Sequence, residues 1–216
     1  MELTPAPEVA PDARRCAWAD GSDDYRAYHD TEWGVPVRGD RALFERITYE
    51  AFQSGLAWVT VMRKRPAFRA AFAGFDPHRV AAFGDADVAR LLADPGIIRN
   101  RAKVLATIDN ARALCTLWEQ EGDGALGALM AAHAPDDAAL EAEGFRRPPR
   151  EITDLPSACT ATRTLARALK ARGFRFVGPT TLYAGMQANG FVDDHLVGCF
   201  RRGLGHRFPA DRTRTE

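Results

Sequence analysis

The chain has 216 residues, and its 29 Lys and Arg residues balance 29 Asp and Glu residues, so the formal net charge is zero. Hydrophobic residues make up 46% and charged residues 27%, an ordinary globular composition that excludes collagen, coiled-coil arrays and wholesale disorder. A zero net charge also argues against a generic basic protein that coats nucleic acid.

The ends of the chain differ in composition from its middle. No apolar run approaches ~18 residues, so no membrane span is expected. The first residues lack the basic-then-apolar order of a secretory signal, and we therefore expect a cytoplasmic protein whose four cysteines are thiols or metal ligands. We expect a loose extension over residues 1–14, one folded unit over 15–200 and a flexible tail over 201–216.

The apolar periodicity predicts an all-α fold, because β-branched alternation is scarce and Ala, Leu and Arg dominate the periodic stretches. Asp40 and Asp85 are expected N-caps, and Gly173 is expected to end a helix. Loops are expected at 122–127 and, because of paired prolines, at 145–150. In chain order, the expected helices cover residues 40–54, 57–72, a short segment from 76, 85–93, 99–118, 158–173, 179–190 and 195–199.

Residues 85–118 predict two helices joined by a tight turn. The second helix would begin with free backbone N–H groups, which bind anions together with the helix dipole. Gly96 lacks a Cβ and lets a ligand come close, while Arg99, Arg101 and Lys103 add positive charge. This pattern is typical of a helix-hairpin-helix that holds a DNA phosphate without reading sequence. The alternative is a plain hairpin joining two core helices.

Glu50 lies on the apolar stripe of the helix 40–54, seven residues after Leu43 and three after Ile47. A carboxylate there costs free energy unless something pairs with it. A carboxylate among aromatic rings suits a flat cationic ligand, because the rings stack on its faces and the acid accepts hydrogen bonds from its edge. The alternatives are a structural hydrogen bond for Glu50 and a core role for the aromatics. Five of the eight Trp and Tyr residues are candidates: Trp18, Tyr25, Tyr28, Trp33 and Trp58.

Two Cys/His pairs lie at opposite ends of the chain. His195 and Cys199 are four residues apart, so on a helix they project from one face. Cys16 and His29 form the other pair, and if the chain ends meet, the four side chains make a tetrahedral set. Four protein ligands leave no open position, so such a zinc would be structural. The alternative is free buried cysteines and capping histidines.

The zero net charge results from segregated clusters. Residues 1–62 hold 11 acids and 6 bases, and residues 119–143 hold 7 acids and no base. Basic residues gather at 63–69, 97–112 and 163–175. Each cluster taken alone favours a solvated helix face. Together with the predicted hairpin, the basic clusters allow a DNA partner despite the overall balance.

Several short strings are more specific than periodicity. They are Arg15-Cys16-Ala17-Trp18, Tyr28-His29-Asp30-Thr31-Glu32-Trp33-Gly34-Val35-Pro36, Ser54-Gly55-Leu56-Ala57-Trp58, Gly96-Ile97-Ile98-Arg99, Gly173-Phe174-Arg175-Phe176-Val177-Gly178 and Asp194-His195-Leu196-Val197-Gly198-Cys199. With them the chain resembles the 3-methyladenine DNA glycosylase I family, bacterial base-excision repair enzymes of the helix-hairpin-helix glycosylase superfamily. The resemblance runs from about residue 15 to 199, and the stretch 122–150 follows it poorly.

The resemblance implies a role for each candidate residue. Glu50 would be the base-recognising carboxylate and Tyr28 a second polar contact, with Trp18 and Trp58 stacking and Tyr25 and Trp33 lining the pocket. The family's structural zinc ligands fall on Cys16, His29, His195 and Cys199. The turn at Gly55 and Leu56 matches the loop that approaches the gap left by an extruded base. The hairpin contacts to DNA fall on Gly96, Ile97, Arg99, Arg101 and Lys103.

The resemblance also implies an activity. The protein would flip 3-methyladenine out of alkylated double-stranded DNA and release it as the free base by hydrolysis. With no Lys nucleophile indicated, it would be a monofunctional monomer that leaves an abasic site. No acid lies between Asp109 and Glu119, so Glu50 would recognise the positive base without acting as a strong general base. The alternatives are a zinc-stapled DNA-binding module without glycosylase activity and a hydrolase whose zinc activates water.

Overall fold

The computed structural model describes residues 13–204, so the predictions for the two chain ends lie almost entirely outside it. These residues form ten α-helices and three 3-10 helices with no strand among them, which confirms the all-α prediction. No helix in this range is long and apolar enough to cross a membrane. The α-helices are α1 (Asp23–Thr31), α2 (Asp40–Gln53), α3 (Trp58–Ala71), α4 (Pro77–Ala81), α5 (Asp85–Ala93), α6 (Arg101–Glu121), α7 (Ala125–Ala132), α8 (Asp137–Ala142), α9 (Thr160–Ala171) and α10 (Pro179–Ala188), and the 3-10 helices are η1 (Ala17–Gly21), η2 (Ala73–Phe75) and η3 (Ile152–Asp154).

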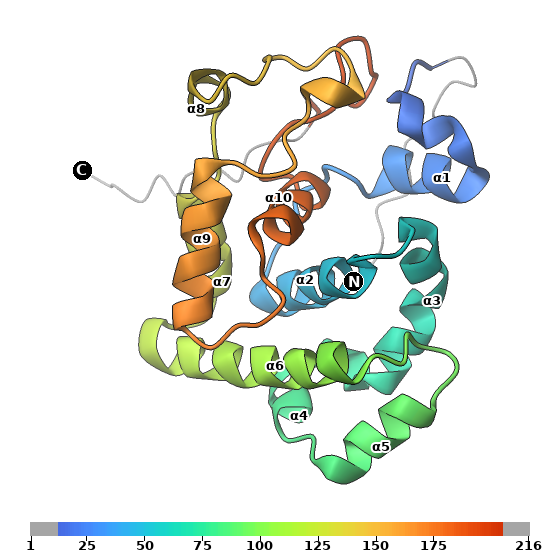
Figure 1. Cartoon of the computed structure of the whole chain (residues 1–216), viewed down its shortest axis with the longest axis vertical. Coiled ribbons are helices and arrows are strands. Elements are labelled where there is room, and N and C mark those ends of the chain that lie inside the picture. The colour runs from blue at the N-terminus through green and yellow to red at the C-terminus, as the bar shows by residue number, and fades with distance from the viewer. Residues whose placement is uncertain (1–12, 205–216) are drawn as a thin grey trace.

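Helix α2 lies at the centre of the molecule, with α10 on one side and the long helix α6 on another (Figure 1). It also contacts α3 and α7. Leu43, Phe44 and Ile47 on its predicted apolar face are buried. Burying each such side chain stabilises the fold by roughly 1.5–3 kcal/mol. Because α2 is central, Glu50 near the C-terminal end of this helix is buried.

The ends of two predicted helices differ from expectation. The N-cap positions belong to Gly39 and Gly84, so the predicted caps at Asp40 and Asp85 are wrong. The buried Asp40 carboxylate instead accepts hydrogen bonds from Trp118 Nε1 at 2.7 Å and from the backbone N–H groups of Leu126 and Gly127 at 3.0 and 2.9 Å. Those amides belong to the first turn of α7, whose free donors attract a carboxylate. Helix α7 also begins inside the predicted loop 122–127.

The predicted helix over residues 195–199 is absent, and this segment is a loop with a turn. The turn closes with a hydrogen bond from the Cys199 N–H to the Leu196 carbonyl at 2.9 Å. Gly198 within it has a φ of +86°, a left-handed conformation that interrupts an α-helix and suits glycine. The turn nevertheless brings residues 195 and 199 together as the helix would have done.

Candidate metal centre and base-recognition site

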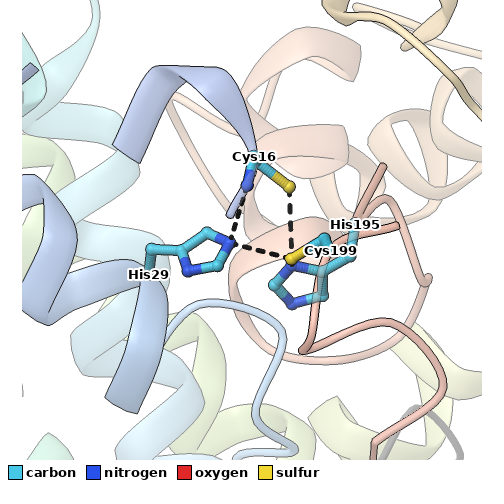
Figure 2. Close-up of side chains that lie close together, drawn as sticks. All are labelled: Cys16, His29, His195 and Cys199. Atoms are coloured by element: carbon cyan, nitrogen blue, oxygen red, sulfur yellow. Dashed lines mark hydrogen bonds between the residues drawn. The ribbon is translucent and has the colours of Figure 1, made fainter. Parts of the chain in front are cut away.

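Four Cys and His side chains from distant parts of the sequence converge at one buried point (Figure 2). Cys16 precedes η1, His29 lies in α1, and His195 and Cys199 come from the loop after α10. Their ligand atoms all lie within 4.8 Å of one another. Cys199 Sγ is 3.3 Å from His29 Nε2 and 3.6 Å from His195 Nδ1, and Cys16 Sγ is 3.7 Å from His195 Nδ1.

These distances fit one tetrahedral metal ion. With metal–sulfur bonds of ~2.3 Å and metal–nitrogen bonds of ~2.05 Å, the sulfur–nitrogen edge of a regular tetrahedron is about 3.6 Å. The three observed sulfur–nitrogen separations run from 3.3 to 3.7 Å. Two thiols and two imidazoles are also the donor set that structural zinc prefers. The group could therefore hold a metal ion without rearrangement.

The residue after His29 fixes how its imidazole is presented. His29 Nδ1 lies 2.8 Å from Asp30 Oδ1, which leaves Nε2 directed at the sulfurs. Asp30 in turn accepts a hydrogen bond from Arg15 at 2.8 Å. Burial alone would raise the pKa of Asp30, but the hydrogen bonds from Arg15 and His29 outweigh it and lower that pKa. A carboxylate–histidine pair of this kind orients metal-binding imidazoles.

The two sulfurs also act on each other. Their hydrogen bond is the largest cause that lowers the pKa of Cys199, with further hydrogen bonds from both histidines. The same hydrogen bond, together with burial, raises the pKa of Cys16. A metal-ligating cysteine is a thiolate, and the lowered pKa of Cys199 acts in that direction.

Glu50 is the buried carboxylate of a second site. It is 7% exposed and has no hydrogen-bond partner among residues 13–204. Burial raises the pKa of Glu50 to about 8, although the positive charge of Arg46 acts in the opposite direction. Helix α10 passes close by, since a Cβ on Gly185 would lie 4.0 Å from Glu50 Cγ. A buried carboxyl group without a partner is costly unless a ligand supplies one.

Tyr28 and Trp58 lie beside Glu50. Their ring centroids are 5.4 Å apart with the planes tilted by 49°. Burial, and after it the negative charge of Glu50, raises the pKa of Tyr28, which shows that the phenol and the carboxylate share one environment. The buried Nε1 of Trp58 has no hydrogen-bond partner within the described chain. The structure thus brings together three of the predicted base-recognition residues.

Asn189 is a further polar residue that the sequence did not indicate. It follows α10 and is fully buried, with Nδ2 donating to the Gly185 carbonyl at 2.7 Å. Its Oδ1 is buried with no partner in residues 13–204. A Cβ on Gly185 would lie 4.0 Å from both Asn189 Nδ2 and Glu50 Cγ, so the two residues flank the same glycine. In the sequence, a single Asn at a helix end indicates only a cap, and its place near Glu50 depends on the tertiary fold.

Trp18, Tyr25 and Trp33 form the remainder of the aromatic cluster. Trp18 lies edge-on to Tyr25 at 6.2 Å and to Trp33 at 5.1 Å, and its ring is 6.4 Å from that of Tyr28. The Trp33 ring is 4.6 Å from the imidazole of His195. These aromatics therefore connect the Cys/His centre to Tyr28, and Trp33 packs directly on His195.

The predicted hairpin is present as α5, residues 94–100 and α6. A Cβ on Gly96 would come within 3.0 Å of Ala67 Cβ, so this turn packs too closely against α3 for any larger residue. The Ile97 side chain is buried in the core, whereas Arg99 and Arg101 are exposed. No hydrogen bond within residues 13–204 uses the backbone N–H groups of Ile97 or Arg99. These donors and the two arginines remain available to an anion.

Lys103 does not fit the predicted phosphate contact. Its side chain is buried, and Nζ donates to the carbonyls of Phe52 at 2.9 Å and Ser54 at 2.7 Å. These carbonyls lie at the C-terminal end of α2. A positive charge there donates hydrogen bonds to free acceptors and interacts favourably with the negative end of the helix dipole. Lys103 therefore holds the loop that carries Gly55 and Leu56. In that loop Gly55 has a φ of +81° and Leu56 is 40% exposed.

A surface hollow of about 620 Å³ in the described chain is not lined by Glu50. It is bordered by segments at residues 13–20, 150–153 and 196–197. A smaller hollow of about 170 Å³ is bordered by Tyr28, Glu32 and Arg65. Glu50 lines neither of these hollows, although Tyr28 borders the smaller one.

Fold and site together define an all-helical protein in which a Cys/His centre supports an aromatic cluster around a buried carboxylate. A family model described as methyladenine glycosylase matches residues 18–202. The chain belongs to the methyladenine glycosylase family. It is 43% identical over 185 residues to DNA-3-methyladenine glycosylase 1 of Escherichia coli, covering 86% of this chain and 95% of that protein. It is 38% identical over 187 residues to DNA-3-methyladenine glycosylase of Haemophilus influenzae, covering 86% and 96%.

Solved structures are similar over the same range. A crystal structure of 3-methyladenine DNA glycosylase I has a TM-score of 0.78 and 42% identity, covering 88% of this chain and 100% of that one. A tyrosine-to-phenylalanine variant of a 3-methyladenine DNA glycosylase I in complex with 3-methyladenine has a TM-score of 0.77 and 27% identity, covering 89% and 99%. Both likenesses extend across nearly all of the helical unit.

Proposed function

We propose that this protein is a DNA glycosylase that removes 3-methyladenine from alkylated double-stranded DNA by hydrolysis and leaves an abasic site. The observation that carries the proposal is the buried Glu50 carboxyl group, which has no hydrogen-bond partner within the described chain and lies beside Tyr28. The relatives named as 3-methyladenine DNA glycosylases support the same substrate. On this proposal the protein works as a cytoplasmic monomer.

Glu50 recognises the charge of the damaged base. Methylation at N3 makes adenine cationic, so its glycosidic bond is already labile and the base departs as a neutral group. With a pKa of about 8, the Glu50 carboxyl is mostly protonated at neutral pH until a positive partner arrives. A cationic base favours the carboxylate form and donates hydrogen bonds to it, whereas neutral adenine gives no such gain. Selectivity therefore comes from charge, while Tyr28 and Trp58 contact the ring faces.

Extrusion of the base depends on two loops. The exposed Leu56, carried by the turn at Gly55, fills the gap left in the duplex. At the start of α6, the exposed Arg99 and Arg101 and the backbone N–H groups of Ile97 and Arg99 hold a DNA phosphate. These contacts carry no sequence information, so the pocket alone decides which base is removed.

A structural zinc ion is the metal that the Cys/His centre fits best. Cys16, His29, His195 and Cys199 would hold it, and its chemistry there would be to cross-link segments that are more than 160 residues apart in sequence. Four protein ligands complete the tetrahedral shell, so the ion would stabilise the fold and take no part in hydrolysis. Through Trp33 and Trp18, the centre supports the aromatic cluster around Tyr28.

The test is mass spectrometry of the bases released from methylated duplex DNA. The unmodified protein should release 3-methyladenine, and Glu50→Gln should lose most of that release while remaining folded. The exposed Glu141→Gln on α8 is the matched control and should keep full activity. DNA binding without base release would favour the alternative, a zinc-stapled binding module. Full activity in Glu50→Gln would overturn the role of the carboxylate.

A further inference from the structure

Phe176 is a bulky aromatic residue in an unfavourable backbone conformation on the surface. It lies between α9 and α10, has a φ of +55° and is 36% exposed. Its ring makes no contact with another aromatic ring among the described residues. Bulky residues rarely adopt this conformation, and where they do, the surrounding structure or a function must account for it.

Phe75 shows the same φ of 55° with a structural explanation. It is fully buried, and its ring packs edge-on against those of Phe44 and Tyr49 at 6.0 and 5.4 Å. Core packing thus offsets the strained backbone of Phe75. Phe176 is partly exposed and has no ring contact within the described residues, so packing of this kind does not offset its backbone conformation.

The residue before Phe176 is held rigidly by α6. Asn110 Nδ2 donates to the Arg175 carbonyl at 3.0 Å, and the Arg175 N–H donates to Asn110 Oδ1 at 2.6 Å. The Arg175 guanidinium pairs with Asp109 at 2.6 Å. This double hydrogen bond fixes the backbone that presents Phe176. An exposed ring held in place loses little conformational entropy when it binds a partner.

The face of α6 that holds the Phe176 loop through Asn110 also holds the Leu56 loop through Lys103. Lys103 and Asn110 are seven positions apart, so they lie on one side of the helix and about 10 Å from each other along its axis. Lys103 holds the end of α2 next to Leu56, and Asn110 holds the loop of Phe176. The segment between α9 and α10 indeed runs alongside α6 (Figure 1). Two exposed apolar side chains therefore project from loops anchored on one helix face.

We propose that Phe176 is a second apolar contact to the DNA duplex, packing against a base or sugar beside the extruded nucleotide while Leu56 fills the gap. This inference rests on the proposed glycosylase function. The proposed phosphate contacts at Arg99 and Arg101 lie at the start of α6, followed along the helix by the anchor of the Leu56 loop at Lys103 and the anchor of the Phe176 loop at Asn110. Two helical turns of α6 correspond to about three base pairs at 3.4 Å each, a spacing that fits adjacent steps of one site.

Apolar side chains that wedge between or against base pairs are a common means of stabilising a distorted duplex. A ring that packs on a base contributes to binding of the duplex and has no contact with the free base in the pocket. Phe176 is therefore a positioning residue, since it acts on the duplex and leaves the reacting bond to others. Its loss should affect DNA and not free 3-methyladenine.

The test compares Phe176→Ala with Phe176→Trp and with Ile152→Ala, an exposed apolar control in η3. We expect Phe176→Ala to lower kcat/KM on methylated duplex about tenfold, the size of one lost aromatic–base stack. Phe176→Trp should recover most of this loss, and Ile152→Ala should match the unmodified protein. Binding of free 3-methyladenine and the thermal midpoint should be the same in all of them.

Two results would overturn the inference. One is an unchanged kcat/KM in Phe176→Ala. The other is a parallel loss of duplex activity, free-base binding and thermal stability, which would make Phe176 a structural residue. Failure of the proposed function is recognised separately, because then the unmodified protein releases no base. Anisotropy with an abasic duplex still measures the Phe176 contact in that event, and an unchanged Kd there would count against it.

Discussion

Replacing Glu50 by Gln should change how the stability of the protein depends on pH. Burial raises the pKa of Glu50 from 4.5 to about 8 in the folded chain. Glutamine resembles the protonated carboxyl in shape and cannot ionise. The variant has no proton to release in either state. In the unmodified protein, Glu50 ionises in the unfolded chain above about pH 4.5 but in the folded chain only above about pH 8, so rising pH favours unfolding.

The size of the effect follows from the two pKa values. Because the folded pKa is raised, the neutral carboxyl contributes stability that is fully present below about pH 4.5 and is lost as the pH rises through about 8. Each factor of ten in the ionisation constant corresponds to about 1.4 kcal/mol. Between pH 6 and pH 9, ionisation of Glu50 should thus remove about 3 kcal/mol of unfolding free energy. Glu50→Gln should lack this loss.

Urea unfolding followed by circular dichroism at several pH values between 6 and 9 would measure it. Groups other than Glu50 titrate in both proteins, so the difference between the two curves isolates the one carboxyl. The exposed Glu141→Gln should run parallel to the unmodified protein. A constant difference between Glu50→Gln and the unmodified protein over this range would refute the reasoning, since it would mean that Glu50 ionises like an exposed residue.

Three further predictions concern other parts of the fold. Cys199→Ser should reduce the zinc measured by atomic absorption and lower the thermal midpoint, and unchanged zinc content would remove Cys199 from the ligand set. Lys103→Ala should lower stability but leave the salt dependence of DNA binding unchanged, whereas Arg101→Ala should reduce the slope of log Kd against log salt by about 1. Asp40→Ala should cost about 3 kcal/mol in urea unfolding because three donors lose their acceptor, and a cost below about 0.5 kcal/mol, typical of surface sites, would contradict this.

Local sequence patterns predicted the helices well where one face is strongly apolar. The spacing of Leu43, Phe44 and Ile47 placed α2 within one residue of its observed end, because burial of that face is decided by periodicity alone. Caps were predicted less well. Asp40 has the chemistry of an N-cap, yet its carboxylate serves a different helix 86 residues further along the chain. A local pattern cannot show which of several free helix ends an acid will reach.

The sequence by itself determined the helical class, the central helix, the two Cys/His pairs and a carboxylate on an apolar face, because each depends on residues close together in the chain. The tertiary structure decided which side chains from distant parts of the chain contact one another. It brought Cys16 and His29 onto Cys199, and it turned Lys103 from the expected DNA surface toward the end of α2. The physical reason is that burial, pairing and exposure depend on packing between distant segments, which no spacing along one helix records. The net charge of the whole chain likewise does not predict DNA binding, because binding depends on where folding places each basic cluster.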